Sequence, residues 1–416
     1  MSTSPTAIDP ELPQPLSMGS VLRIATMRKL WYAQVISVFG DFLALFAVIG
    51  VLTFKLHATP EQVTGVQIAY LLPIAMLGVV AGVFVDRWPL KPLMVSSDSI
   101  RAGLVLLLLF ATQLWHFYAI LAAISLVSSF FGPAQGVAIR SAVPFHGLRS
   151  ANALMQQVMF GMRVVGPAAA AFLVASFGAA SCYLADSVSF VGSALLIFSV
   201  EFLPTEKPAA QQASGLARIG TDMKQGISFI VHHAGLLFVI LAMACGMFVI
   251  GCFGPLIAVY VRDDLHASTQ VFGLASALIG VGMLVGINAL AAFAKNVKSA
   301  TLVYAALAGI GLGLLILAFT SHVWSTFLGT LVIGFAVAGI IIPSQTMIQQ
   351  ETPQALMGRV GSTVMSLVFT AQISGLVLSG ILANVLGVRD VFTGCAILLA
   401  ILIVVGRIWM DPSANT

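Results

Sequence analysis

Twelve stretches of about 20 mostly apolar residues follow one another along this chain, and each is long enough to cross the roughly 30 Å hydrocarbon core of a bilayer as a helix. Only 8% of the 416 residues are charged and 59% are hydrophobic, so one water-soluble core cannot enclose the apolar side chains. The apolar runs are continuous rather than alternating, which favours helices over barrel strands. The sequence therefore predicts an all-α membrane protein.

One long polar connection divides the predicted spans into two bundles of six. The spans are expected near residues 30–53, 64–85, 93–114, 117–139, 151–175, 181–203, 234–260, 270–293, 300–320, 323–347, 360–386 and 391–409. The expected organisation is a cytoplasmic N-terminal tail at 1–29, an N-terminal six-helix bundle at 30–203, a cytoplasmic linker at 204–233, a C-terminal six-helix bundle at 234–410 and a cytoplasmic tail at 411–416.

Lysine and arginine residues set the expected orientation, because cytoplasmic loops of membrane proteins carry an excess of them. With the N-terminus inside, 14 of the 19 fall in inner segments, 3 in outer loops and 2, Arg101 and Arg163, within spans. We therefore expect a multi-pass protein of the plasma or inner membrane with both termini in the cytoplasm. The net charge of +4 reflects this loop bias and does not indicate binding to nucleic acid.

Short similarities recur between the halves at a nearly constant offset. Gly132–Gln135 resembles Ile342–Gln345 at an offset of 210, and Pro144 matches Pro353 at 209. Duplicated bundles related by an axis along the membrane normal place a site between them near the midplane, which rocking opens alternately to either side. Two such pseudo-symmetric bundles are typical of transporters. The alternative is a structural repeat without transport.

The loop between the second and third predicted spans carries Gly82, Asp86, Arg87 and Lys91 in the order G-x-x-x-D-R-x-x-x-K. It resembles the signature loop of the major facilitator superfamily, although Pro89 replaces the usual second glycine. The resemblance implies the major facilitator fold and a conformational latch, in which the carboxylate pairs with neighbouring helix ends in one conformation and releases them in the other. The alternative is a loop charge that only fixes topology.

Further residues are assigned to the same latch. Asp98 and Arg101 are spaced i, i+3 on the third predicted span, where they can pair with each other or with Arg87. We expect them to support the latch rather than to couple ions.

Other motifs extend the resemblance over nearly the whole chain after residue 20. Gly166–Pro167 in the fifth predicted span is similar to the antiporter-type helix motif, although alanines replace the glycine pair that usually follows. Three further motifs belong to the same resemblance: Gln34-x-x-Ser37-x-x-Gly40-Asp41, Ser150–Leu154 and Gly358–Val360. Together they resemble the drug:proton antiporter branch that includes macrolide-efflux and siderophore-exporter proteins. This resemblance does not indicate which substrate is transported.

Two charges lie at mid-membrane in the N-terminal bundle, where each costs roughly 2.5–3.5 kcal/mol on insertion scales. Asp41 and Arg163 are about 15 Å from the inner ends of their predicted spans. We predict that Asp41 is the proton-coupling carboxylate and that Arg163 is its counter-charge or modulator. The alternatives are a permanent ion pair and an Asp41 held by hydrogen bonds near Gln34 and Ser37. Asp186 is expected to serve packing or an outer gate.

The substrate cavity is expected to have apolar, aromatic and amide-bearing walls, which suit hydrophobic or amphipathic compounds better than sugars. Fewer than half of the candidates are expected to touch the cavity, because the others pack between helices. The candidates are Gln34, Tyr70, Phe131, Gln135, Met159, Phe248, Gln345, Phe369 and Gln372.

These features together predict a secondary active transporter that exports lipophilic small molecules in exchange for protons, as a monomer in the bilayer. The alternatives are a dedicated exporter of one metabolite, siderophore or lysolipid, and an importer. No enzyme activity, cofactor or metal site is predicted, because the sequence lacks the HExxH, GxSxG and phosphate-loop motifs, and its four cysteines have no ligand spacing. A channel is disfavoured because no ring of repeated polar residues is evident.

Overall fold

The computed structural model describes residues 16–85, 88–202, 225, 227–293, 297–353 and 356–410, and its regular structure in these ranges is helical. A short helix, α1 (Met18–Arg23), comes first. Six long helices follow: α2 (Ala25–Gly50), α3 (Pro60–Val85), α4 (Leu90–Leu107), α5 (Leu114–Ala142), α6 (Leu148–Phe177) and α7 (Ala179–Phe198). The last six are α9 (Ala234–Asp263), α10 (Thr269–Phe293), α11 (Ser299–Phe319), α12 (Val323–Glu351), α13 (Met357–Leu386) and α14 (Val388–Met410).

These helices confirm the predicted all-α membrane protein. Within the described ranges, 11 helices are long and apolar enough to cross a membrane. Large apolar side chains such as those of Val188, Leu312 and Ile397 remain exposed along the middle of the helices. In water such a surface would be unfavourable, whereas a lipid surround accepts it.

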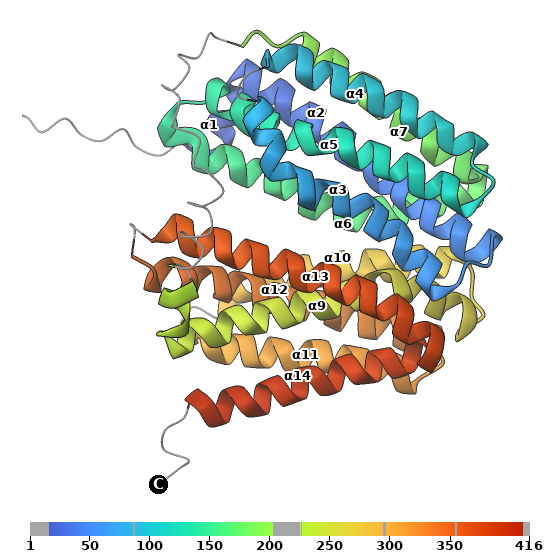
Figure 1. Ribbon diagram of the computed structural model, residues 1–416, viewed down its shortest axis with the longest axis vertical. Helices are drawn as coiled ribbons and strands as arrows, with labels where there is room; N and C mark the ends of the chain where they lie inside the picture. Colours follow the sequence, from blue (N-terminus) through green and yellow to red (C-terminus); the bar gives the residue numbers. More distant parts are fainter. Residues whose placement is uncertain are drawn as a thin grey trace, which may run out of the picture.

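Helices α2 to α7 pack together as one half of the molecule, and helices α9 to α14 pack together as the other (Figure 1). In the first half α2 packs against α6 and α7, and α3 and α4 pack against α5. In the second half α9 packs against α13, and α12 packs against α10 and α11. Two helix pairs join the halves most extensively: α6 with α10, and α3 with α13.

The halves repeat one backbone plan. His57, between α2 and α3, and His266, between α9 and α10, both have a φ of 49°, and Gly178 and Gly387 join the last two helices of each half at φ 80° and 97°. The offsets, 266 − 57 and 387 − 178, are both 209 residues. All four residues with positive φ in the described chain fall into these two pairs. Pro144 and Pro353, also 209 apart, follow the ends of α5 and α12.

The sequence around the two histidines repeats as well. Leu56-His57-Ala58-Thr59 corresponds to Leu265-His266-Ala267-Ser268. Backbone N–H groups at Leu56 and Leu265 donate to the carbonyls of Val51 at 2.9 Å and Tyr260 at 3.2 Å, which are again 209 residues apart. This turn was not among the repeats predicted from the sequence, although its four-residue match was a usable signal.

Candidate functional site

The two halves are closed against each other where α2 ends and α3 begins, which we call the far end. The Phe46 ring of α2 stacks on the Phe272 ring of α10 with centroids 5.5 Å apart. Gly380 of α13 lies so close to Thr64 of α3 that no Cβ fits between them. Arg262, at the end of α9, donates hydrogen bonds across the interface to the carbonyl oxygens of Thr53 and Ala58.

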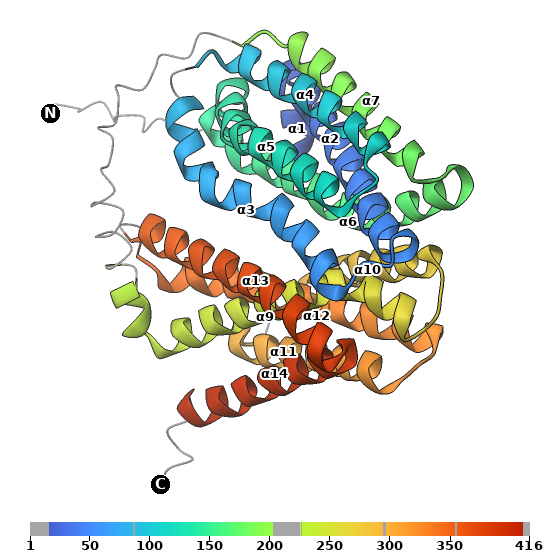
Figure 2. The ribbon, with the colours of Figure 1, turned by 45° about the vertical axis from the view of Figure 1, so that its right-hand side comes forward.

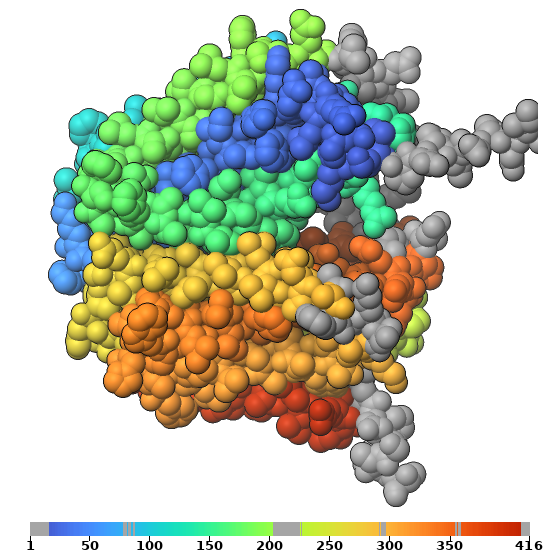
Figure 3. All heavy atoms as spheres, turned by 180° about the vertical axis from the view of Figure 1, so that it is seen from behind, coloured from blue at the N-terminus to red at the C-terminus, as the bar shows by residue number. Residues whose placement is uncertain are grey.

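At the opposite end, which carries α1 and which we call the α1 end, the halves diverge (Figure 2). The space-filling view shows a hollow between them there (Figure 3). Phe369 lies eleven residues, or about three turns, before Gly380 and therefore on the same face of α13. That face contacts α3 at the far end, but Phe369 is 53% exposed because the halves have separated at its level. The hollow is thus a space between the bundles that opens toward the α1 end.

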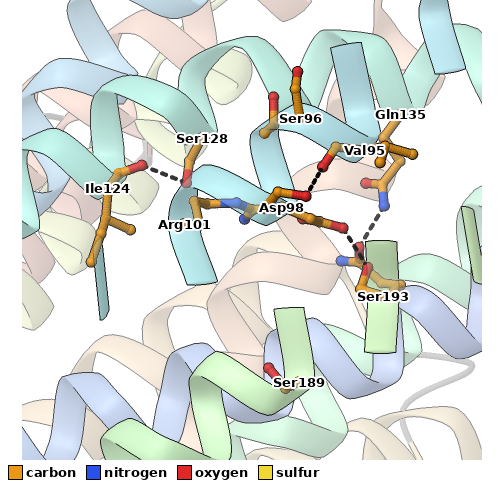
Figure 4. Close-up of polar contacts among 12 residues, drawn as sticks. Val95, Ser96, Asp98, Arg101, Ile124, Ser128, Gln135, Ser189 and Ser193 are labelled. Atoms are coloured by element: carbon orange, nitrogen blue, oxygen red, sulfur yellow. Dashed lines mark hydrogen bonds and ion pairs between the residues drawn. The ribbon is translucent and has the colours of Figure 1, made fainter. Parts of the chain in front are cut away.

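A buried ion pair lies inside the first half, between α4 and α7 (Figure 4). Arg101 pairs with Asp98 one turn away, as its spacing predicts. The Ser193 hydroxyl of α7 donates to the second carboxylate oxygen of Asp98 at 2.7 Å. The guanidinium carbon of Arg101 lies 4.4 Å from the ring centroids of both Phe131 and Phe190. This cation is therefore fixed in position by aromatic faces and by one carboxylate.

Asp41 of α2 faces the same cluster. Its carboxyl interacts electrostatically with Arg101 and Asp98, and Asp186 of α7 interacts with Asp41 in turn. Arg101 is therefore a basic group whose charge acts on the Asp41 carboxyl, whereas the sequence pointed to Arg163 as its counter-charge or modulator. Asp186, for which the sequence predicts a role in packing or in an outer gate, belongs to this cluster.

Gly40 explains how α2 and α7 bring these acids together. A Cβ at this position would overlap the Asp186 carboxylate and the Ser189 side chain. The Ser189 hydroxyl donates to a carboxylate oxygen of Asp186 at 3.2 Å. Three carboxyls and one guanidinium consequently share one region, in which Asp98 is 0% and Asp186 is 1% exposed while Asp41 is half-buried.

Arg163 of α6 has a different position. Val164 contacts Gly280 of α10, and Gly166 contacts Phe42 of α2, so the side chain of Arg163 points into the sector between α2 and α10. This sector faces the space between the two halves. Arg163 is exposed there.

The predicted cavity residues differ in their exposure. Phe369 and Gln345 are exposed, whereas Phe131 is buried against Arg101. Gln34 of α2 and Gln135 of α5 are joined inside the first half, where the Gln135 amide donates to Gln34 at 2.5 Å. The remaining candidates, half-buried, are Tyr70, Met159, Phe248 and Gln372.

The structure describes only part of the predicted latch. Asp86 and Arg87 lie outside the described residues, as do the surroundings of Gly82. Lys91 places its ammonium 5.0 Å from the centroid of the Phe198 ring. Gly166 and Pro167 of the antiporter-type motif lie at two helix contacts, with α2 and α10 respectively.

The cysteines carry no cross-link. All four are free thiols, and Cys182, Cys252 and Cys395 are buried. The described residues contain no group of three or more His, Cys, Asp or Glu side chains arranged to hold a metal ion.

Sequence comparison places this architecture in a known group of proteins. The family model for the Major Facilitator Superfamily matches residues 30–375 and again 239–415. The chain belongs to the Major Facilitator Superfamily. Its members are transporters rather than enzymes, so the protein is a secondary transporter of the multi-pass membrane type.

Several curated members of the superfamily are similar over most of their length. The MFS-type transporter YfiS of Bacillus subtilis is 27% identical over 88% of this chain and 89% of its own length. Macrolide efflux protein A of Streptococcus pyogenes is 25% identical over 87% and 90% of the two chains. The multidrug efflux pump Tap of Mycolicibacterium fortuitum is 25% identical over 82% and 85%.

Solved structures of other transporters share the fold. The nucleoside transporter NupG matches with a TM-score of 0.71 at 13% identity, over 93% of this chain and 99% of its own. A bacterial homologue of the iron transporter ferroportin, in an inward-facing state, matches with a TM-score of 0.68 at 17% identity, over 93% and 99%. At these identities the matches describe the fold alone.

Proposed function

We propose that this transporter exports hydrophobic or amphipathic small molecules in exchange for protons, by alternating access, as a monomer with both termini in the cytoplasm. The six-helix bundles at 30–203 and 234–410 would rock against each other about the space between them. With the termini inside, the hollow at the α1 end is the cytoplasmic entrance and the structure is the inward-open state.

The observation that carries proton coupling is the cluster of Asp41, Asp98 and Asp186 around one guanidinium. A single Arg101 cannot balance three ionised carboxylates in a low-dielectric interior, so protons bound or released there change the charge that the bundle must accommodate. Asp41, half-buried, is the member of the cluster that solvent reaches most readily. It would load and release the proton as the bundles rock.

Similarity to named exporters and the exposed residues between the halves support the proposed direction and substrate class. Macrolide efflux protein A and the multidrug efflux pump Tap are exporters by name, and both align with most of this chain. The exposed Phe369 side chain, on the face of α13 that meets the first half, suits a substrate with an apolar body.

Transport by purified protein in liposomes tests the proposal. An imposed pH gradient should drive saturable movement of lipophilic dyes, and a protonophore should abolish it. Equal rates with and without the gradient would contradict proton coupling. If the protein transported one native metabolite but none of the dyes, it would be a dedicated exporter rather than a multidrug exporter.

A further inference from the structure

One face of α6 presents polar groups to the space between the halves. Asn152, Gln156 and Arg163 are all exposed, and their spacings of four and seven residues place them along one stripe. Val165 and Phe172, which are 50% and 65% exposed, lie on the opposite face and suit contact with lipid. The stripe is therefore a polar wall of the hollow.

Arg163 is the innermost member of this stripe, and its charge is not compensated in the described part of the protein. No hydrogen bond or ion pair of its side chain occurs among the described residues. The surrounding protein desolvates the guanidinium, although the side chain remains accessible from the hollow. A cation at this depth is costly unless an anion accompanies it.

The nearby carboxylates do not offer that anion to the hollow. Asp98 and Asp186 are almost wholly buried inside the first half. Asp41 lies on the face of α2 that carries Gln34, whose amide is bonded to Gln135 of α5, so it too points into the bundle. Away from the helix ends, Arg163 is the exposed charge among the described residues.

We propose that Arg163 binds an acidic group of the transported molecule, with Gln156 and Asn152 as hydrogen-bonding partners on the path from the α1 end. The substrates are then lipophilic organic anions, such as aromatic carboxylates or sulfonates. The planar guanidinium provides paired N–H donors that match the two oxygens of a carboxylate. Phe369 provides an apolar surface on the opposite half. This inference rests on the proposed function and narrows its substrate class.

A binding experiment with two dyes of one skeleton tests the assignment. Fluorescein is anionic and rhodamine 123 is cationic, and both are built on a xanthene core. Fluorescence anisotropy with the purified full-length protein gives their dissociation constants without any pH gradient. We expect the native protein to prefer fluorescein, and Arg163→Gln to weaken fluorescein binding by about tenfold or more while leaving rhodamine 123 binding unchanged or tighter.

Two variants separate charge at this position from net charge and from folding. Arg163→Lys should retain fluorescein binding to within a few-fold. Lys55→Gln removes one positive charge from an exposed position at the far end, away from the hollow, and should bind both dyes as the native protein does. Native preference for rhodamine 123, an unchanged fluorescein affinity in Arg163→Gln, or an equal loss with Lys55→Gln would overturn the inference. If the protein bound fluorescein as expected but a pH gradient did not drive transport, the proposed proton coupling would be wrong and the anion site at Arg163 would stand.

Discussion

Arg262 of the second half donates hydrogen bonds to the carbonyl oxygens of Thr53 at 2.9 Å and Ala58 at 2.7 Å in the first half. Thr53 is the residue equivalent to Arg262, since 262 − 53 is the 209-residue offset of the repeat. Helix α2 ends in the π-helical turn η1 (Val51–Lys55), in which a carbonyl accepts from the N–H five residues later. The Ala58 N–H instead donates to the Leu52 carbonyl at 2.9 Å, so the Thr53 carbonyl can accept from Arg262. Asp263 holds the guanidinium through contacts of 2.5 and 2.6 Å. The far end is thus closed by an arginine of one repeat and by two buried backbone carbonyls of the other.

Replacing Arg262 with Met should open the far end. Hydrogen bonds to charged groups contribute about 1.5–3 kcal/mol each, so losing two should shift the ratio of the two conformations by at least about tenfold. Spin labels at the exposed positions Arg140 and Glu351, at the α1 ends of α5 and α12, should move closer together as that end closes.

Arg389 provides the matched control, because it lies at the far end but bonds within its own half, to Asp264 at 2.6 Å and Ser321 at 2.9 Å. Arg389→Met should leave the label distances unchanged. The same shift in both variants would show that Arg262 acts through general stability rather than through the interface.

Replacing Asp41 with Asn should abolish transport driven by a pH gradient while preserving substrate binding and downhill movement. The amide keeps the size and hydrogen-bonding capacity of the side chain but carries no titratable proton. Flux measurements in liposomes, with and without the gradient, separate these activities. Asp390→Asn, an exposed acid at the start of α14, should transport normally. Native rates in Asp41→Asn would exclude this carboxyl as the coupling group.

Replacing Arg101 with Gln should strongly destabilise the first half. The variant leaves Asp98 in a buried site without its cation, a change that costs about 3–5 kcal/mol. The double variant Asp98→Asn with Arg101→Gln should melt at a higher temperature than Arg101→Gln alone, since no uncompensated charge then remains between those two positions. Thermal unfolding in detergent measures both. A double variant no more stable than the single one would refute mutual compensation.

Replacing Gly40 with Ala should push α2 away from α7, because the new methyl group would overlap Asp186 and Ser189. We expect a loss of about 1–3 kcal/mol, typical of overpacking, together with weaker pH-driven transport. Gly192→Ala on α7 is the control, since its Cβ would meet only the Ile36 side chain at 3.9 Å. Thermal unfolding should distinguish the two variants, and equal tolerance would mean that the α2–α7 contact adapts freely.

Predictions from the sequence succeeded where local pattern was sufficient. The apolar runs gave the helices, and Asp98 and Arg101 paired because three residues of helix bring two side chains to one face. The loop motif led to the superfamily, which the family match confirms. The repeat at His57 and His266 was readable in the same way but was overlooked.

The partners of mid-membrane charges were not readable from local pattern. Asp41 and Arg163 lie at a similar depth in the membrane, which suggested that they would meet. Depth does not determine contact, because the rotation of each helix about its own axis decides which neighbour a side chain faces. Gly40 sets the approach of α2 to α7 and brings Asp186 to Asp41, while the contacts of Val164 and Gly166 turn Arg163 toward the space between the halves. The sequence by itself determined the membrane helices, their duplication and the charges within them, because hydrophobicity and spacing act along the chain. Only tertiary packing decided which charges share a cluster and which faces the cavity.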